Sequence, residues 1–311
     1  MEIFKEVLFL KNKKFIYKSL MILLGVFLVA VYALVPFNTH RETSDTNWML
    51  DVNDNMKIKD LSIPGTHDSG ATHSLFDVSG KCQDLDIKSQ LNIGVRFFDI
   101  RLEMRNNKFY IVHSFVDQKL TFKETLEDFV EFIKKYPSEF LIVSIKKEND
   151  SKNSSYGFEE CLLKYFNEYK DYISYDNELP ELVKDARGKI YILSRYNDSS
   201  IGIPAYNEWQ DDTTFTMGDF YVQDNYCIED INEKVKDISD TIKYTQESDK
   251  YVLNFTSCYL DNDFPPSYAT KAACDINNWL LHYYDNKDKL GILIVDYASE
   301  ELIELIYKRN F

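Results

Sequence analysis

The stretch FLIVSI, residues 140–145, is apolar at every position except Ser144. Two later runs, IYIL at residues 190–193 and GILIV at residues 291–295, have the same character. A strand that is buried on both faces shows such a continuous apolar run, because helices cover both sides of a parallel sheet. The chain is therefore expected to be an α/β protein built around a parallel sheet.

Further strand-like runs surround these three, and helical patterns lie between some of them. A (β/α)8 barrel commonly occupies about 250 residues as one domain, which suits a chain of 311 residues. We therefore predict a single distorted, TIM-like (β/α)8 barrel. Its third strand follows the second after the short turn Arg105–Lys108, which leaves no room for a helix. The expected strands are Ile58–Pro64, Gly94–Leu102, Phe109–His113, Phe140–Ile145, Lys189–Ser194, Phe220–Gln223, Val252–Thr256 and Gly291–Val295. The expected helices are Ser89–Leu91, Thr121–Tyr136, Phe158–Tyr169, Ile228–Ser248 and Thr270–Tyr284.

An N-terminal hydrophobic helix is expected to precede the barrel. Residues 20–37 (LMILLGVFLVAVYALVPF) carry no charge and follow the basic stretch Lys11–Lys18. Such a run is just long enough to cross a bilayer, and the basic residues before it favour a cytoplasmic N-terminus. The alternatives are a signal peptide cleaved near Ala33 and a buried core helix. An anchor or a signal peptide would place residues 38–311 outside the cytoplasm, membrane-anchored or secreted. The expected parts are a basic segment at 1–19, an anchor or signal core at 20–37, a linker at 38–53 and the barrel at 54–311.

Composition limits the classes of partner. The chain has a net charge of −15, a hydrophobic content of 44% and an aromatic content of 15%. This content suffices for a sizeable core and excludes a wholly disordered chain. Nucleic acid is not expected as a partner, because contacts with phosphates dominate such binding and an acidic protein repels phosphates. The cysteines form no C-x-x-C motif and no cluster with histidine in the sequence, so neither a zinc site nor a disulfide framework is expected. They are Cys82, Cys161, Cys227, Cys258 and Cys274. We expect a monomer.

Charged residues stand at the ends of most of the predicted strands. Barrel enzymes carry their chemistry at the carboxyl ends of the strands. His67 and Asp68 follow the first strand, and His113 ends the third. Asp99 and Arg101 alternate on the second strand, so both side chains point to the same face. Later strand ends supply Lys146, Arg195, Asp224, Tyr226 and Asp296.

Two histidines near an arginine suit acid–base chemistry on a phosphodiester. Histidine both takes and gives a proton near neutral pH, and the donors of arginine match the oxygens of a phosphate. A carboxylate behind an imidazole fixes its tautomer and stabilises its charged form. Taken singly, each residue also has a structural reading, such as a hydrogen-bonded strand end or, for Arg101, a salt bridge inside the barrel. Their convergence on one rim favours a catalytic site.

Eight motifs run along the chain in order: IPGTHDSGA (63–71), GVRFFDIR (94–101), VHS (112–114), VSIKKE (143–148), DARGKIYILSRY (185–196), VQDNY (222–226), LNFTS (253–257) and IVDY (294–297). In order and spacing they resemble the bacterial phosphatidylinositol-specific phospholipase C family, over nearly all of residues 50–311. The resemblance implies a distorted barrel that cleaves phosphatidylinositol into diacylglycerol and inositol 1,2-cyclic phosphate. Slower hydrolysis of the cyclic product would follow.

The resemblance also assigns roles to residues. His67 is similar to the general base that takes the proton of the inositol 2-hydroxyl, supported by Asp296. His113 is similar to the general acid that protonates the departing diacylglycerol oxygen, assisted by Asp68. Arg101, supported by Asp99, would bind the phosphate. The implied inositol-binding shell is Lys146, Arg195, Asp224 and Tyr226.

Arg101 also bears on the question of a metal. Calcium-dependent relatives carry acidic residues where this strand reads Asp99-x-Arg101. An arginine there would repel calcium and take its place as a fixed cation, so we expect a metal-independent enzyme with no cofactor. Secreted members of the family often insert exposed tryptophans into lipid. The matching stretches here offer only Leu75, Phe76, Leu260 and Phe264 beside acidic residues, so phosphatidylinositol in membranes is the expected partner but insertion is expected to be weak.

Two other functions remain open at this point. A metal-dependent glycerophosphodiester phosphodiesterase also uses a barrel with two histidines, but it expects His-Arg after the first strand and Glu-x-Asp on the second. This chain has His67-Asp68 and Asp99-x-Arg101 there. A non-catalytic phosphoinositide-binding module is the second alternative, although both histidines are present.

Overall fold

Parallel strands form the centre of the computed structural model, which describes residues 46–74, 80–196, 201–260, 269–283 and 287–311. Contacts divide the chain into residues Met1–Arg41 and Glu42–Phe311, and all the described residues belong to the second unit. The predictions for residues 1–45 therefore lie outside the described residues. Among the residues that are described, no helix has the length and apolar character needed to cross a membrane.

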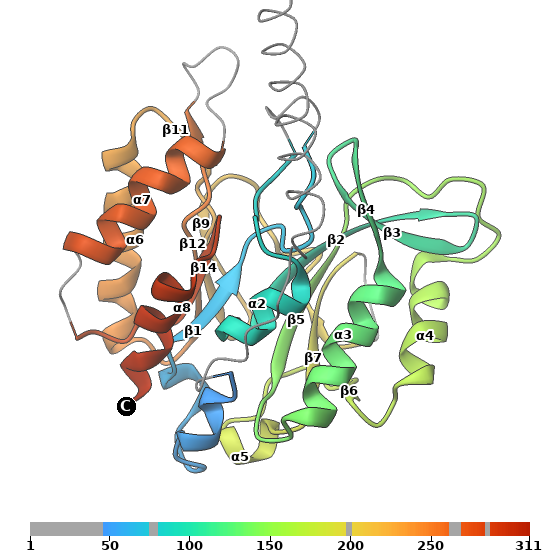
Figure 1. Cartoon of the computed structure of the whole chain (residues 1–311), viewed down its shortest axis with the longest axis horizontal. Helices are drawn as coiled ribbons and strands as arrows, with labels where there is room; N and C mark the ends of the chain where they lie inside the picture. The colour runs from blue at the N-terminus through green and yellow to red at the C-terminus, as the bar shows by residue number, and fades with distance from the viewer. Residues whose placement is uncertain (1–45, 75–79, 197–200, 261–268, 284–286) are drawn as a thin grey trace, which may run out of the picture. The chain divides into compact units, whose positions relative to one another are not determined.

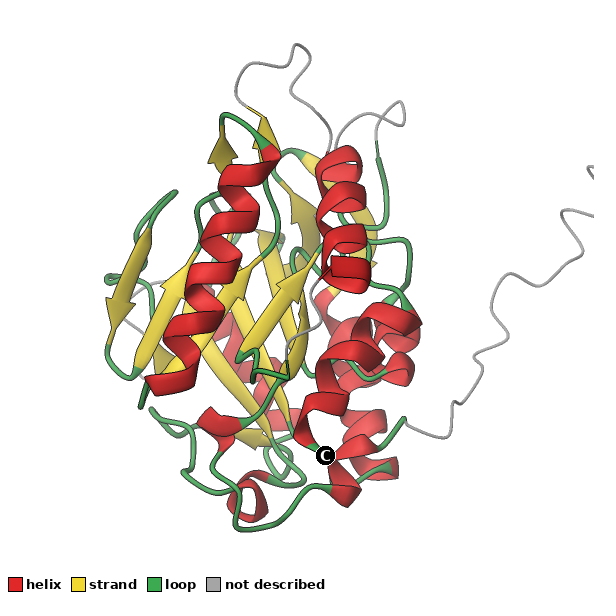
Figure 2. Cartoon of the chain, turned by 90° about the vertical axis from the view of Figure 1, so that its left-hand side faces the viewer, coloured by secondary structure: helices red, strands yellow, loops and turns green. Residues whose placement is uncertain are grey.

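The main sheet curls into an incomplete barrel (Figures 1 and 2). Its parallel strands follow the order β7-β5-β2-β1-β14-β12-β10, with β6 added in parallel beside β7. In the described part of the chain, no backbone ladder joins the β6–β8 side to the β9–β10 side, so the barrel stays open there. The predicted α/β barrel is thus confirmed in its distorted form. The strand bounds are β1 (Ile63–Thr66), β2 (Phe97–Arg105), β5 (Leu141–Lys147), β6 (Ile173–Ser174), β7 (Ile190–Arg195), β8 (Ile203–Pro204), β9 (Thr214–Met217), β10 (Phe220–Gln223), β12 (Tyr251–Phe255) and β14 (Ile292–Val295).

The prediction that Phe109–His113 is a parallel strand of the barrel is wrong. β3 (Lys108–His113) runs antiparallel to β2 and pairs on its other side with β4 (Val116–Thr121), forming an arm at the carboxyl end of β2 (Figure 1). The turn between β2 and β3 is Asn106-Asn107, with φ values of 50° and 59°. Two successive residues with positive φ match the twist of a tight hairpin, and asparagine tolerates that conformation. The first strand also starts later than predicted, because Ile58–Asp60 form a short 3-10 helix, η2.

Helices cover the outer face of the curled sheet (Figure 2). The amphipathic helix α3 (Phe122–Lys135) begins with a capping box, in which Thr121 and Glu124 satisfy each other's backbone N–H groups. Short helices α5 and α8 lie outside the predicted set, since neither is long enough for a clear period. The remaining bounds are α2 (Ile87–Ile93), α4 (Phe158–Glu168), α5 (Val183–Ala186), α6 (Ile231–Glu247), α7 (Ala269–Tyr283), α8 (Glu300–Tyr307), η1 (Trp48–Asp51), η3 (Lys308–Asn310), β11 (Cys227–Ile228) and β13 (Tyr259–Leu260).

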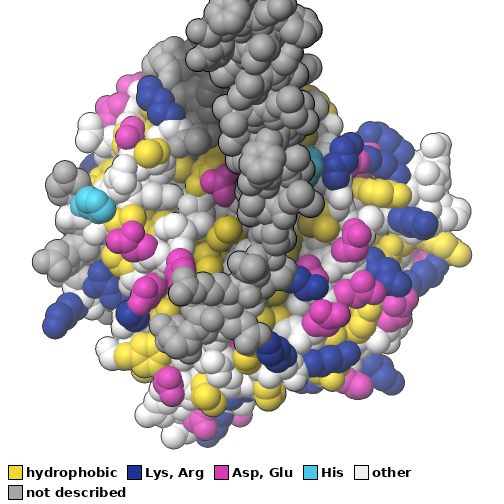
Figure 3. Space-filling model, in the orientation of Figure 1, with side chains coloured by type: hydrophobic (Ala, Val, Ile, Leu, Met, Phe, Trp, Pro, Cys, Tyr) yellow, Lys and Arg dark blue, Asp and Glu magenta, His cyan; other side chains and the backbone are white. Residues whose placement is uncertain are grey.

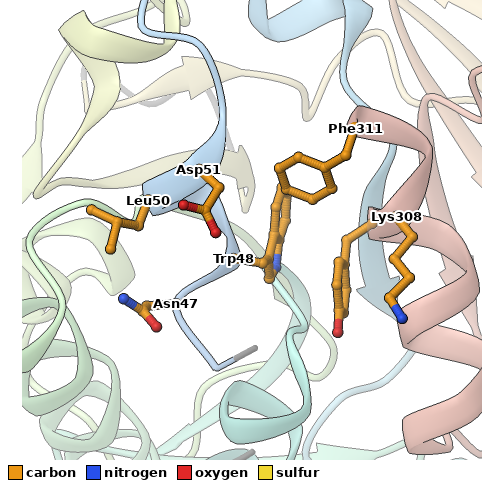
Figure 4. A pocket seen from close by; sticks show the side chains of 7 residues that line it. Asn47, Trp48, Leu50, Asp51, Lys308 and Phe311 are labelled. Carbon is orange, nitrogen blue, oxygen red and sulfur yellow. The ribbon is translucent and has the colours of Figure 1, made fainter. Parts of the chain in front are cut away.

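The amino end of the barrel is closed by η1 and the C-terminal residues. The rings of Trp48 and Tyr307 stack at 5.4 Å, and a surface pocket opens between the two segments (Figure 4). Nearby, the fully buried Arg96 and Glu139 form an ion pair at 2.8 Å. These contacts lie at the opposite end of the strands from the predicted chemistry. On the face drawn in Figure 3, basic side chains lie among acidic ones.

Candidate active site

His67 follows β1 directly, at the carboxyl edge of the parallel strands. Thr66, the last residue of β1, pairs with Val295 of β14, so His67 and Asp296 become neighbours. Nδ1 of His67 lies 2.8 Å from Oδ1 of Asp296, and Nε2 lies 2.7 Å from Nη2 of Arg101. Because a guanidinium group only donates, Nε2 is the acceptor and the ring proton sits on Nδ1, facing Asp296.

The surroundings of His67 raise the pKa of its imidazole on balance. Burial lowers the pKa of the imidazole, and so does Arg101. The charge and hydrogen bond of Asp296, with Asp68, outweigh both effects, and the pKa is raised above its ordinary value of 6.5. His67 therefore combines a lone pair on Nε2 with a carboxylate that stabilises the charge gained with a proton. Those are the properties of a general base.

Arg101 lies between the acidic residues. Its Nε and Nη2 atoms donate to Oδ2 of Asp99 at 3.2 and 3.1 Å, and Nη1 lies 3.3 Å from Oδ2 of Asp68. Oδ1 of Asp99 lies 3.4 Å from Nη1 of Arg195. Burial raises the pKa of Asp99, but the two arginines lower it more, so the pKa falls well below its usual range. Asp99 stays ionised and holds Arg101 in place.

His113 reaches the site from the hairpin arm. Its Nε2 atom lies 3.5 Å from Oδ2 of Asp68. Asp68 is fully buried, and neither of its carboxylate oxygens accepts a hydrogen bond from the described residues. Burial raises the pKa of Asp68 above its usual value despite the opposing effect of Arg101. Arg101 thus connects two imidazole–carboxylate pairs, with Nη2 against His67 and Nη1 against Asp68.

A second group of polar residues surrounds Arg101. Lys146 pairs with Glu148 at 2.8 Å, and Oε1 of Glu148 lies 3.8 Å from Nη1 of Arg101. The same Oε1 accepts a hydrogen bond from the backbone N–H of Ser114 at 3.1 Å. Burial raises the pKa of Glu148, but Arg101 and Lys146 outweigh it, so the pKa is lowered and Glu148 is a carboxylate. It follows the strand in the motif 143–148, and the geometry adds it to the predicted site residues.

Trp209 connects the two sides of the open barrel, and the sequence offered no motif that identified it. Its ring centroid lies 3.5 Å from Cζ of Arg195, which ends β7. Its Nε1 atom donates to Oδ2 of Asp224, after β10, at 3.2 Å. The predicted shell residues Arg195 and Asp224 are therefore joined through an indole. Tyr226 instead donates its hydroxyl to Asp211 at 2.7 Å.

Cys82 also enters the site, contrary to the prediction of no cysteine–histidine cluster. Its Sγ atom and one ligand atom each of His67 and Asp296 all lie within 4.8 Å of one another. The same is true of Sγ with one ligand atom each of Asp68 and His113. Burial raises the pKa of the thiol well above its usual value, and the nearby carboxylates add to this effect. Folding brings Cys82 to both histidine–aspartate pairs.

Known proteins similar to this chain identify its family. The chain is 30% identical over 294 residues to a "1-phosphatidylinositol phosphodiesterase" of Listeria monocytogenes, covering 90% of each chain. It belongs to the phosphatidylinositol-specific phospholipase C family. A second relative of that name, from Staphylococcus aureus strain Newman, is 30% identical over 284 residues, with 82% of this chain and 89% of the relative covered.

Solved structures share the fold of this chain over most of its length, and a family model matches its first part. The phosphatidylinositol-specific phospholipase C X domain matches residues 61–196. A structure of a mutant enzyme from Staphylococcus aureus has a TM-score of 0.76 and 26% identity, covering 85% of this chain and 98% of the other. The enzyme from Listeria monocytogenes has a TM-score of 0.70 and 25% identity, with 86% and 100% covered.

Proposed function

We propose that this chain cleaves phosphatidylinositol into diacylglycerol and inositol 1,2-cyclic phosphate by metal-independent acid–base catalysis. One observation carries the proposal. The same guanidinium group, Arg101, contacts Nε2 of His67 on one side and the carboxylate of Asp68, beside His113, on the other. A base, an acid and a phosphate-binding cation are thus available around one point.

His67 acts on the nucleophile, which belongs to the substrate. The inositol 2-hydroxyl attacks the neighbouring phosphorus, so the reaction is intramolecular and its effective molarity is high. Arg101 turns from Nε2 to the phosphate as the substrate enters, and Nε2 takes the hydroxyl proton. Asp296, at 2.8 Å from Nδ1, stabilises the resulting imidazolium.

His113 completes the reaction by protonating the diacylglycerol oxygen as the P–O bond breaks. Its separation of 3.5 Å from Asp68 is long for a hydrogen bond, and such contacts often tighten when substrate binds. The carboxylate of Asp68, which accepts no hydrogen bond from the described residues, is then ready to stabilise the protonated ring. Arg101 offsets the negative charge that develops on the phosphate.

Arg101 also supports metal independence. Its side chain contacts Asp68 and Asp99 and approaches Glu148, which are the oxygen ligands that a calcium ion at this point would use. The guanidinium neutralises these carboxylates and supplies a fixed positive charge for the phosphate. The acidic residues are therefore supports for the arginine.

The inositol ring is proposed to bind beside Arg101, over Lys146, Arg195, Asp224 and Tyr226. Charged groups from three strand ends offer donors and acceptors for the ring hydroxyls. Trp209 positions Arg195 through its ring and Asp224 through its Nε1–H. We add Trp209 and Glu148 to the substrate-binding shell.

The substrate is lipid, so the site must meet a membrane surface. We propose that the protein works outside the cytoplasm as a monomer, either anchored through residues 20–37 or released after cleavage of a signal peptide. N-terminal sequencing of the mature protein distinguishes the two forms. An N-terminus just after Ala33 is expected for a cleaved leader, whereas an intact residue 1 is expected for the anchor.

The central experiment is cleavage of phosphatidylinositol micelles by the full chain in excess chelator, followed by phosphorus NMR. Cyclic inositol phosphate is the expected product, and its absence would overturn the proposal. Activity that appears only with calcium would favour the metal-dependent phosphodiesterase. His67→Ala and His113→Ala should each abolish cyclisation while the circular dichroism spectrum stays native. Binding to the lipid without cleavage by the unaltered chain would favour the non-catalytic module.

A further inference from the structure

Cys82 is held rigidly between the loops that carry the catalytic residues. Its backbone N–H donates to the carbonyl of Ala71 at 2.8 Å, and its carbonyl accepts from the N–H of Tyr297 at 2.8 Å. The next residue, Gln83, donates from Nε2 to the carbonyls of His67 and Val295, each at 2.9 Å. The thiol is therefore fixed relative to the exits of β1 and β14. Its side chain plays no part in the proposed reaction.

Three donor groups of different chemistry meet at this thiol. Ligand atoms of Asp68, Cys82 and His113 all lie within 4.8 Å of one another. Both oxygens of Asp68 are buried and accept no hydrogen bond within the described structure, and Nδ1 of His113 is likewise buried without such a partner. Arg101 at 3.3 Å and His113 at 3.5 Å are ion-pair partners of Asp68, but neither contact is a hydrogen bond, so the carboxylate keeps lone pairs that a metal ion could take.

The donor set selects the kind of cation. A thiolate, an imidazole and a carboxylate suit Zn²⁺, which binds sulfur, nitrogen and oxygen ligands in tetrahedral sites. Calcium and magnesium prefer oxygen ligands throughout, so the thiol disfavours them. The group His67, Cys82 and Asp296 shares the same sulfur, but its imidazole and carboxylate are already hydrogen-bonded to each other at 2.8 Å.

We propose that Asp68, Cys82 and His113 form an inhibitory Zn²⁺ site within the active site. The Cys82 thiol loses its proton to solvent as the Zn–S bond forms, and water fills the fourth position. The positive charge of Arg101, whose Nη1 atom lies 3.3 Å from Oδ2 of Asp68, repels the ion. The negative charges of Asp99, Glu148 and Asp296 reduce that repulsion. Zinc engages the imidazole of His113 and so removes the proton donor. The inhibition rests on the proposed function, whereas the binding does not.

The test compares three proteins: the full chain, Cys82→Ser and the control Cys161→Ser. Cys161 is also buried, but it lies on α4 and donates its thiol to the Asn107 carbonyl. Each protein is stripped with chelator, dialysed and assayed on phosphatidylinositol micelles with zinc, calcium or magnesium chloride. Zinc alone should inhibit the full chain and Cys161→Ser. For Cys82→Ser, the zinc concentration that halves activity should rise about tenfold or more, since even outer-shell changes cost that much affinity. Each protein is compared with its own zinc-free rate.

A spectroscopic readout separates this inference from the proposed function. Cobalt(II) added to the stripped full chain should give a thiolate-to-cobalt charge-transfer band that Cys82→Ser lacks and Cys161→Ser keeps. Equal zinc inhibition of Cys82→Ser and the full chain, or a cobalt spectrum without that band, would overturn the site. If the stripped chain makes no cyclic product, the proposed function fails, and the cobalt spectrum still tests the site. Should Cys82→Ser lose its native circular dichroism, Cys82→Ala replaces it.

Discussion

Replacing Trp209 examines how much the open side of the barrel contributes to substrate binding. The indole donates to Asp224 at 3.2 Å and stacks 3.5 Å from Cζ of Arg195. Trp209→Phe keeps an aromatic face but removes the donor. A hydrogen bond to a charged group contributes about 1.5–3 kcal/mol, and this one holds Asp224 in place before substrate binds, so its loss should raise KM by at most about tenfold to a hundredfold. Trp209→Leu also removes a desolvated cation–π contact of about 2 kcal/mol, which adds a further factor of about ten or more.

The assay measures initial rates on phosphatidylinositol in mixed micelles, with inositol 1-phosphate as a competitive inhibitor. Both variants should raise KM and the inhibition constant together, while kcat stays within about threefold, because the contact acts on ground state and transition state alike. Trp48→Phe is the control, since that indole lies at the other end of the barrel and donates to the Gly94 carbonyl. A fall in kcat at unchanged KM would refute the reasoning. It would assign Trp209 to the chemical step.

Three further changes test the site and the fold. Asp296→Asn should lower kcat about 10²–10⁴-fold. Because the carboxylate raises the His67 pKa above 6.5, its loss should move the acidic limb of the kcat/KM profile to lower pH. An acidic limb that does not move would contradict the pairing of Asp296 with His67. Arg101→Lys should reduce kcat/KM about 10²–10³-fold with or without chelator, because a single ammonium cannot replace the fork of donors, and near-normal rates would exclude its role. Glu139→Gln should lower the free energy of unfolding by about 3–5 kcal/mol in urea titrations, because it leaves Arg96 buried without its charged partner. The double variant Arg96→Met/Glu139→Leu should recover most of that loss. A single variant as stable as the unaltered chain would argue against the buried pair.

Much of the candidate site was predictable because parallel strands bring their carboxyl ends to one edge. His67 and Asp296 are 229 residues apart, yet the register of β1 with β14 makes them neighbours. Asp99 and Arg101 share a face through the two-residue period of β2. The hairpin turn at Asn106-Asn107 was also readable, but its consequence for the fold was missed. Two residues with positive φ reverse the chain, so β3 could not join the parallel set.

The residues that sequence reasoning missed depend on long loops. Trp209 lies between β8 and β9, where no periodicity says which way a side chain points. Cys82 was set aside because no histidine stands near it in the chain, and its position follows from hydrogen bonds of Gln83 to two separate strand exits. Patterns of a few residues carry information on strands and turns. They carry little on how a loop packs across the end of a barrel.

The gap between the β6–β8 side and the β9–β10 side of the sheet couples the proposed substrate recognition to the folding equilibrium. Backbone hydrogen bonds do not close that gap within the described structure, whereas Arg195, Trp209 and Asp224 span it with side chains. The headgroup that we propose to be held by Arg195 and Asp224 would link the two edges, so its binding energy would add to the stability of the whole sheet. At a hundred times its dissociation constant, a ligand stabilises the native state by about 2.7 kcal/mol. The bound headgroup would then connect the two edges of the sheet that no backbone hydrogen bonds join in the described structure.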